Sequence, residues 1–255
     1  LILGDAPAER LMRLALAPTP TSPVAARTAA VLPVALDADA VIVSKRPTKH
    51  ETNRLRQAAS RGLGLVLLTP QLSSAVMQAL TEDTELALGP VRPAPLRISE
   101  FDVFRPPLRP FADPQAGDLK QPEFRQVPDL QVRPTHWRVA ARFEDGSPAI
   151  AVRAHTVLVN LPLDPQQTNL PQQTVFVPLM HRLVGCAAGD DGEADSVLAG
   201  QSLGSSPAPA GPGFLRLGAA TGAKSESACA VNLDPAEGDL RRTTPEHVRR
   251  CLQGN

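Results

Sequence analysis

The sequence contains no tyrosine and is poor in other aromatic residues. Of its 255 residues, seven are Phe and one is Trp. We therefore do not expect recognition of bases or sugars by ring stacking. Net charge is absent too, because 26 Lys and Arg side chains are balanced by 26 Asp and Glu side chains. Nucleic-acid-binding proteins carry a basic excess, so we expect no nucleic-acid partner.

Cysteine is scarce, and long apolar runs are absent. Cys186, Cys229 and Cys251 lie far apart and form no CxxC motif. They are either unpaired thiols or include one disulfide. No run of 18 apolar residues is present, and we expect no signal peptide because the chain begins directly with a predicted strand; both predict a soluble segment of a longer protein. The histidines lack metal-binding spacing, and the acidic residues at 190–195 lack that of a calcium loop. We expect no metal ion and no cofactor.

Residues 39–69 organise the rest of the chain. Apolar runs at residues 40–43 and 62–68 flank a polar stretch at residues 48–61. Short runs of Val, Ile and Leu without alternation are typical of strands covered on both faces. A helix between two such runs is how parallel strands are joined. Thr48 and Glu51 have the spacing of a capping box, and Gly62 is placed to end the helix in a left-handed conformation.

The same reasoning extends over residues 1–188. It predicts strands at residues 1–3, 31–36 and 156–161, a hairpin at 139–152, and helices near residues 5–17, 72–80 and 176–184. Asp5 is a candidate N-cap for the first helix. The predicted fold class is α/β, with a mostly parallel sheet and helices on both faces, as in glutamine-amidotransferase-like or flavodoxin-like proteins.

Within this domain, residues 86–134 break the pattern. Prolines recur along the stretch, and four of the seven Phe residues lie in it, at positions 101, 104, 111 and 124. A disordered linker would not contain so many of the scarce aromatic rings. We predict an ordered, irregular insertion that forms either a binding surface or a packed cover on the sheet.

Residues 189–255 form the second predicted domain. An acidic boundary and a stretch rich in Pro, Ala, Gly and Ser precede two alternating segments, near residues 215–217 and 229–233. This order predicts a small antiparallel β module. Thr244, followed by Pro245 and Glu246, is the predicted start of a C-terminal helix.

Four groups of segments resemble the soluble region of the aerotolerance-regulator (BatA-type) family of membrane-anchored proteins. These are residues 39–43 with 61–64, residues 101–102 with 107–111, residues 143–149 with 161–164 and 176–179, and residues 212–214 with 230–237. The last, which continues to residue 240 as AVNLDPAEGDL, is the most specific. A Gly-x-Gly turn expected near Ala154 and His155 is missing.

The resemblance implies a class I glutamine-amidotransferase-like domain followed by a small β module. It further implies a periplasmic location at a bacterial inner membrane, attachment through segments outside this chain, and other envelope proteins as partners. A working amidotransferase needs a Cys nucleophile on a tight strand-to-helix turn, with His and Glu in reach. The corresponding turn, residues 68–71, has neither Cys nor Ser at its apex, where Thr69 stands. We predict a non-catalytic scaffold or protein-interaction domain without catalytic residues.

Two alternatives stay open at this stage. The first is a hydrolase with an unorthodox site near Thr69, His155 or His181, which a structure would test by their proximity.

The second alternative is a small-ligand-binding module at the carboxyl ends of the strands, where open α/β sheets usually bind ligands. Its candidate binding residues are Thr69 and Gln71 at the strand end, with Phe101, Phe104 and Phe111 as one wall.

Overall fold

The apolar runs at residues 40–43 and 62–68 form neighbouring strands of a large sheet. In the computed structural model, β3 (Ala40–Val43) pairs in parallel with β4 (Gly64–Leu68), and α2 (Lys49–Ala59) joins them. Thr48 and Glu51 form the predicted capping box, and Gly62 has a φ of +100° where the chain leaves the helix. The central prediction is therefore confirmed.

The structure describes residues 1–4, 7–19, 22, 24–92, 95–189, 196–198, 213–217 and 227–232. The chain forms two compact units, Leu1–Gly192 and Glu193–Asn255. Asp5 and the predicted helix start at Thr244 lie outside the described residues.

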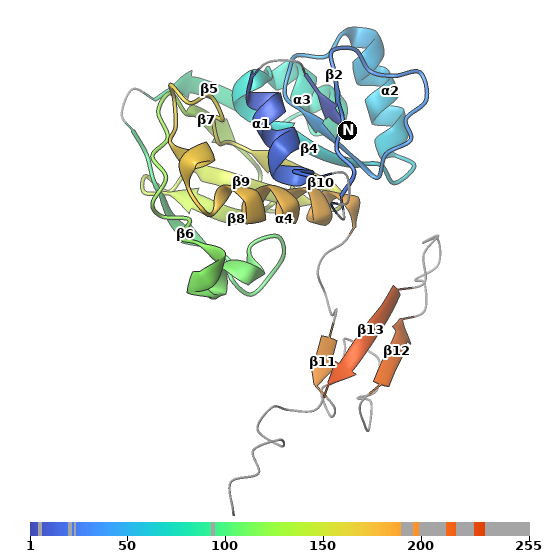
Figure 1. The fold of residues 1–255 in the computed structure, drawn as a ribbon. Coiled ribbons are helices and arrows are strands. Elements are labelled where there is room, and N and C mark those ends of the chain that lie inside the picture. Colours follow the sequence, from blue (N-terminus) through green and yellow to red (C-terminus); the bar gives the residue numbers. More distant parts are fainter. Residues whose placement is uncertain are drawn as a thin grey trace, which may run out of the picture. The chain divides into compact units, whose positions relative to one another are not determined.

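The first unit contains an eight-stranded sheet (Figure 1). Its order is β2 (Thr28–Ala29), β1 (Ile2–Leu3), β3, β4, β10 (Thr156–Val159), β9 (Pro148–Arg153), β8 (Arg138–Phe143) and β6 (Ile98–Phe101). The pairings from β2 to β10 are parallel, whereas those from β10 to β6 are antiparallel. The α/β class and the hairpin of β8 and β9 are confirmed.

Helices cover both faces of the parallel strands. Alternate residues of β3 and β4 enter two separate hydrophobic clusters. One cluster includes α1 (Pro7–Leu16) and α4 (Phe176–Ala188), and the other includes α2 and α3 (Ser74–Thr81). Both faces of these strands are buried, which explains why their sequences are apolar without alternation.

The strand predicted at residues 31–36 is wrong. The short strand is β2, at Thr28–Ala29, and residues 31–36 form a loop beside α2. Arg54 donates hydrogen bonds to the carbonyl oxygens of Leu32, Pro33 and Val34, and Glu51 accepts one from the Leu32 backbone nitrogen. These side chains occupy backbone groups that strand pairing would need.

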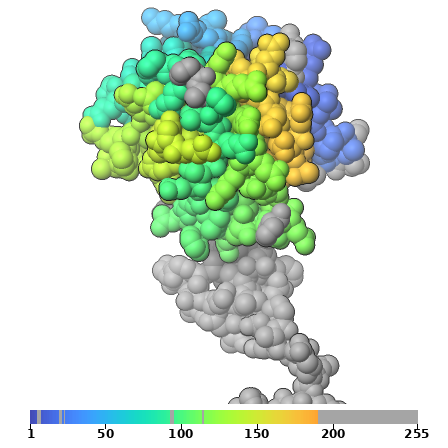
Figure 2. Space-filling view, turned by 90° about the vertical axis from the view of Figure 1, so that its left-hand side faces the viewer, coloured from blue at the N-terminus to red at the C-terminus, as the bar shows by residue number. Residues whose placement is uncertain are grey.

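The insertion at residues 86–134 is less irregular than predicted. It contains β5 (Ala87–Val91), β6 and β7 (Pro128–Gln131), besides the short 3₁₀ turns η2 (Arg109–Ala112) and η3 (Pro114–Ala116). β5 and β7 form a separate antiparallel ribbon, and β6 is an edge strand, positions at which proline is tolerated. Figure 2 shows this stretch, coloured teal to green, spread over one side of the unit.

Rings of this stretch do pack on the domain. Phe124 is fully buried and meets Phe143 edge-to-face, with ring centroids 5.7 Å apart. Such aromatic pairs add stability beyond the area they bury. The prediction of an ordered cover is thus confirmed for this part of the insertion.

The second unit contains a three-stranded sheet. β12 (Gly213–Leu217) and β13 (Ser227–Asn232) are antiparallel, as predicted, and β11 (Ser196–Leu198) adds to β13 in parallel.

A buried carboxylate joins α3 to the strands beyond it. Asp83 is 4% exposed and accepts a 2.7 Å hydrogen bond from Trp137 Nε1. The Arg153 guanidinium lies 4.7 Å from the centroid of the Trp137 ring and 3.7 Å from Asp83 Oδ2. Burial by itself raises the pKa of Asp83, but hydrogen bonds from Trp137 and the Glu85 backbone, with His136 and Arg153 nearby, outweigh it and lower that pKa.

We expect Asp83→Asn to lower the free energy of unfolding at pH 7 by about 1–3 kcal/mol, because Trp137 and Arg153 lose a charged acceptor. The folded-state pKa of Asp83 lies below the ordinary value of about 4. Its carboxylate therefore stabilises the fold above that value, and this contribution is lost as the pH falls through the folded-state pKa. Urea unfolding over a pH series measures both effects. Asp37→Asn, at an exposed position, is the control; identical pH profiles for Asp83→Asn and the wild type would contradict the assignment.

Candidate functional site

The turn that would carry a nucleophile holds a buried structural threonine. Thr69 begins the 3₁₀ turn η1 (Thr69–Gln71) directly after β4 and has no exposed surface. Its hydroxyl donates a 2.7 Å hydrogen bond to Oδ1 of Asn160, which follows β10 and is also fully buried. The Asn160 amide donates to the carbonyl oxygens of Pro128, at 2.9 Å, and Pro148, at 3.2 Å. Thr69 thus belongs to a network that joins β4, β7, β9 and β10.

The structure does not bring together the three residues of the hydrolase alternative. His155 lies in the turn before β10, where its carbonyl oxygen accepts from Leu65 at the start of β4. Thr69 lies at the other end of β4, about 13 Å away at the usual rise per residue. His181 is on α4, and its Nε2 donates a 3.1 Å hydrogen bond to the Ala15 carbonyl oxygen on α1.

The predicted binding residues lie in different places. Gln71 is exposed at the end of η1. Phe101, on β6, aligns through the strand registers with the level of Leu68, but three strands separate it from β4. Four strand spacings amount to about 19 Å. Phe111 is 5% exposed in the core, and Phe104 is 86% exposed. These residues do not form one wall with Thr69.

A different polar cluster occupies the carboxyl ends of β1 and β3. A Cβ atom at Gly4 would lie 2.5 Å from Ser44 Oγ and 2.6 Å from Glu9 Oε1, so the absence of a side chain at Gly4 admits both groups. Ser44 Oγ donates to the Leu3 carbonyl oxygen. Glu9 is 4% exposed, and its Oε2 finds no hydrogen-bond partner within the described part of the chain. The cluster is filled by its own side chains.

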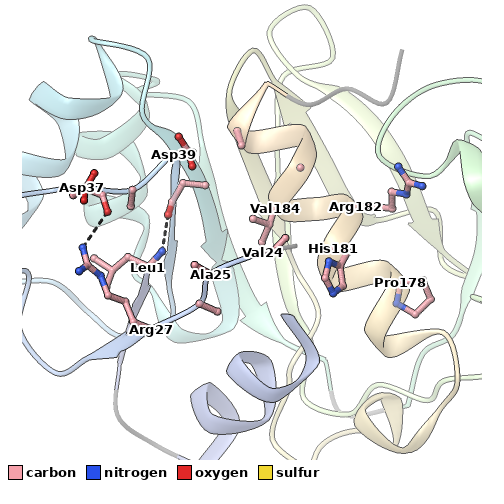
Figure 3. Close-up of a pocket in the computed structure, with 15 residues that line it drawn as sticks. Leu1, Val24, Ala25, Arg27, Asp37, Asp39, Pro178, His181, Arg182 and Val184 are labelled. Carbon is pink, nitrogen blue, oxygen red and sulfur yellow. Dashed lines mark hydrogen bonds between the residues drawn. The ribbon is translucent and has the colours of Figure 1, made fainter. Parts of the chain in front are cut away.

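An open cleft of about 1010 Å³ lies at the opposite edge, beside the amino ends of β1 and β3 (Figure 3). One wall is formed by residues 24–27 and 37–40, and the other by α4. Figure 3 shows Val24 of the first wall near Val184 of α4. Asp39 lies on the strand side of the cleft, and Arg182 lies on the helix. Small side chains on both sides, including Ala26 and Gly185, leave the space open.

The cleft combines an apolar interior with charges of both signs. Arg27, Asp37, Asp39 and Arg182 are exposed side chains along it. Arg27 donates a 3.0 Å hydrogen bond to the Asp37 carbonyl oxygen, which holds together the two segments of the first wall. Its lining is polar and apolar in similar measure, and its volume is at the upper end of the range of small-molecule sites. Open space between charged and apolar side chains is an arrangement that could hold a small ligand.

Metal binding has no support in the described parts of the chain, where no three His, Cys, Asp or Glu residues are grouped to hold an ion. Cys186 is buried on α4, away from the exposed surface. The side chain of Cys229 and all of Cys251 lie outside what the structure describes, so the state of the three thiols stays a prediction.

Neither a scan against protein-family models nor a search of curated proteins found a match to this sequence. The resemblance to the aerotolerance-regulator family therefore stays a prediction.

The cleft has no continuous signature in the sequence. Its lining comes from four separated parts of the chain, and His181 is the one lining residue that the sequence offered as a functional candidate. One local signal was present, because Asp37 and Asp39 stand immediately before a fully apolar strand. Nothing local indicates that α4 lies opposite them.

Replacement of Thr69 by Val tests its structural role. The change keeps the shape but removes the donor to Asn160, and we expect the free energy of unfolding to fall by about 1–3 kcal/mol. Thr69→Ser keeps the hydroxyl and should lose less. Gln71→Ala, at an exposed position two residues on, should change stability by less than about 0.5 kcal/mol. Chemical denaturation of the four proteins measures this, and equal stabilities would show that the network contributes nothing.

Proposed function

We propose that this chain is a non-catalytic scaffold or protein-interaction domain of the bacterial cell envelope, similar to the corresponding region of aerotolerance-regulator proteins. The observation that carries the proposal is the burial and hydrogen bonding of Thr69. A nucleophile must be exposed at its turn and lie next to a base. Here the residue at that turn is buried and its hydroxyl is bound to Asn160.

The arrangement of the parallel strands supports the finer assignment to an amidotransferase-like or flavodoxin-like fold. From β1 the chain passes through α1 to β2 on one side, and then returns to β3 on the other. This reversal is the switch point of doubly wound sheets. The antiparallel strands β9, β8 and β6 extend the sheet beyond that arrangement.

The proposed location is the periplasmic face of the inner membrane, with attachment through segments outside this chain and other envelope proteins as partners. Among the residues that the structure describes, no helix has the length and apolar character to cross a membrane. The proposal rests on the sequence resemblance for location and partners.

A small-ligand-binding module is the second candidate, and the cleft of Figure 3 favours it. A ligand that carries an amine and a carboxylate on an apolar body would match the charges of both signs and the apolar interior. This places the ligand at the amino ends of the strands rather than at the predicted carboxyl ends.

Hydrolysis assays test the first proposal. We expect the full chain to release no ammonia from glutamine and no nitrophenol from p-nitrophenyl acetate above the rate in buffer, because Thr69 is buried and its hydroxyl is bound to Asn160. Thr69→Ala and Cys186→Ala should leave these rates unchanged. A hydrolysis rate that Thr69→Ala abolishes and Gln71→Ala retains, with both variants folded by circular dichroism, would establish the hydrolase alternative.

Filling the cleft tests the second candidate. Val184→Trp places a large ring between the two walls, and Val177→Trp, on the same helix at a position that is 46% exposed and outside the cleft, is the control. We expect amino-acid and dipeptide ligands that raise the Tm of the wild type to do so for Val177→Trp but not for Val184→Trp. An equal Tm shift in both variants would place the ligand elsewhere.

A further inference from the structure

Positive charge is concentrated in one part of a chain that is neutral overall. Residues 27–61 contain seven Lys and Arg side chains but only three Asp and Glu side chains. One of those three, Glu51, is 4% exposed and is occupied by the backbone nitrogens of Leu32 and Thr48. The exposed side of α2 and its flanks therefore carry a net positive charge, with no exposed carboxylate on the helix itself.

The Lys and Arg side chains of residues 27–61 differ in whether they form ion pairs within the described part of the chain. Arg46, Lys49 and Arg61 are exposed, and no ion pair joins them to a described residue. Arg56 lies 3.9 Å from Glu82, but both side chains are well exposed and such a pair is weak. Lys45 contacts Glu51 and the Ala30 carbonyl oxygen.

Two exposed valines lie on the loop beside α2, where Lys45 donates to the carbonyl oxygen of Ala30, the residue before Val31. Val31 is 70% exposed and Val34 is 95% exposed, on the loop of residues 31–36. Val34 lines the same shallow hollow as Arg61, and Asp39 lies at its other side. Neither valine belongs to the hydrophobic clusters of the core, so both side chains are available to a partner.

Side chains of α2 hold the backbone of the loop at residues 32–34. Leu32, between the two valines, is 3% exposed, and its backbone nitrogen donates to Glu51 at 2.9 Å. Arg54 donates to the carbonyl oxygens of Leu32, Pro33 and Val34. Two oppositely charged residues of α2 thus fix the backbone of the loop and turn its valines outward. Arg54 is a positioning residue, since its donors are used within the fold.

We propose that Val31 and Val34, together with Arg46, Lys49 and Arg61, bind the surface of an anionic phospholipid membrane. The cations would lie against the headgroup phosphates and the valines would enter the boundary between headgroups and acyl chains, the combination typical of interfacial binding. A nucleic acid would neutralise the cations but leave the valines in water, and no aromatic ring lies among these residues for stacking. The proposal does not depend on the absence of hydrolytic activity.

Co-sedimentation of the full chain with vesicles tests the proposal. We expect binding to vesicles of phosphatidylcholine and phosphatidylglycerol in equal amounts, weaker binding as salt is raised, and none to phosphatidylcholine alone. Val31→Ser with Val34→Ser should weaken binding about tenfold or more. Lys49→Ala and Arg61→Ala should each weaken it about fivefold.

Two control variants separate this surface from general effects. Val91→Ser removes a valine that is 57% exposed on β5, and Arg97→Ala removes a half-exposed cation outside residues 27–61. Both should bind vesicles as the wild type does. The proposal is overturned by equal binding to both vesicle types, or by binding that the double valine variant retains in full. It is also overturned if polyglutamate binds the wild type and the double valine variant equally while vesicles bind neither, which would identify an acidic protein surface.

Discussion

Burial of β3 and β4 on both faces is the constraint on which the structure depends. Every residue of these strands is buried, and successive side chains enter opposite clusters. Each face therefore needs its own pair of helices. Helix α4 packs so closely on β4 that no side chain fits at Gly64. A Cβ atom there would lie 2.3 Å from the Ala187 carbonyl oxygen on α4. Because both faces are covered, a site can lie only at the carboxyl or the amino ends of these strands.

The carboxyl edge is closed where an amidotransferase-like site would lie. The Asn160 amide ties the ends of β4 and β10 to Pro128 on β7 and Pro148 on β9. β7 belongs to the ribbon that the insertion supplies, and it contacts η1 directly. The insertion therefore lies against the turn that follows β4. The open cleft consequently lies at the amino edge, between the strand starts and α4.

The sequence predicted what local patterns determine. Apolar runs without alternation, the capping box of Thr48 and Glu51, and the turn between β8 and β9 each lie within a few residues, and the structure confirms them. It could not predict that Arg54 binds carbonyl groups about twenty residues earlier and so prevents a strand at residues 31–36. Nor could it predict that β5 pairs with β7 across the insertion, because distant pairing leaves no local signal. The cleft was missed for the same reason.

A change of the side chain at position 69 would not by itself create an accessible nucleophile. A cysteine at this position would still be fully buried, and its thiol would replace the hydroxyl that donates to Asn160. Of the histidines considered for a base, His155 is at the other end of the β4–β10 pair and His181 is bonded to Ala15 on α1. A working dyad would need an exposed apex, an imidazole at the carboxyl edge and removal of the β5–β7 ribbon from η1. A single substitution at Thr69 would therefore not create a hydrolytic site at this turn, because the backbone around it would also have to be rearranged.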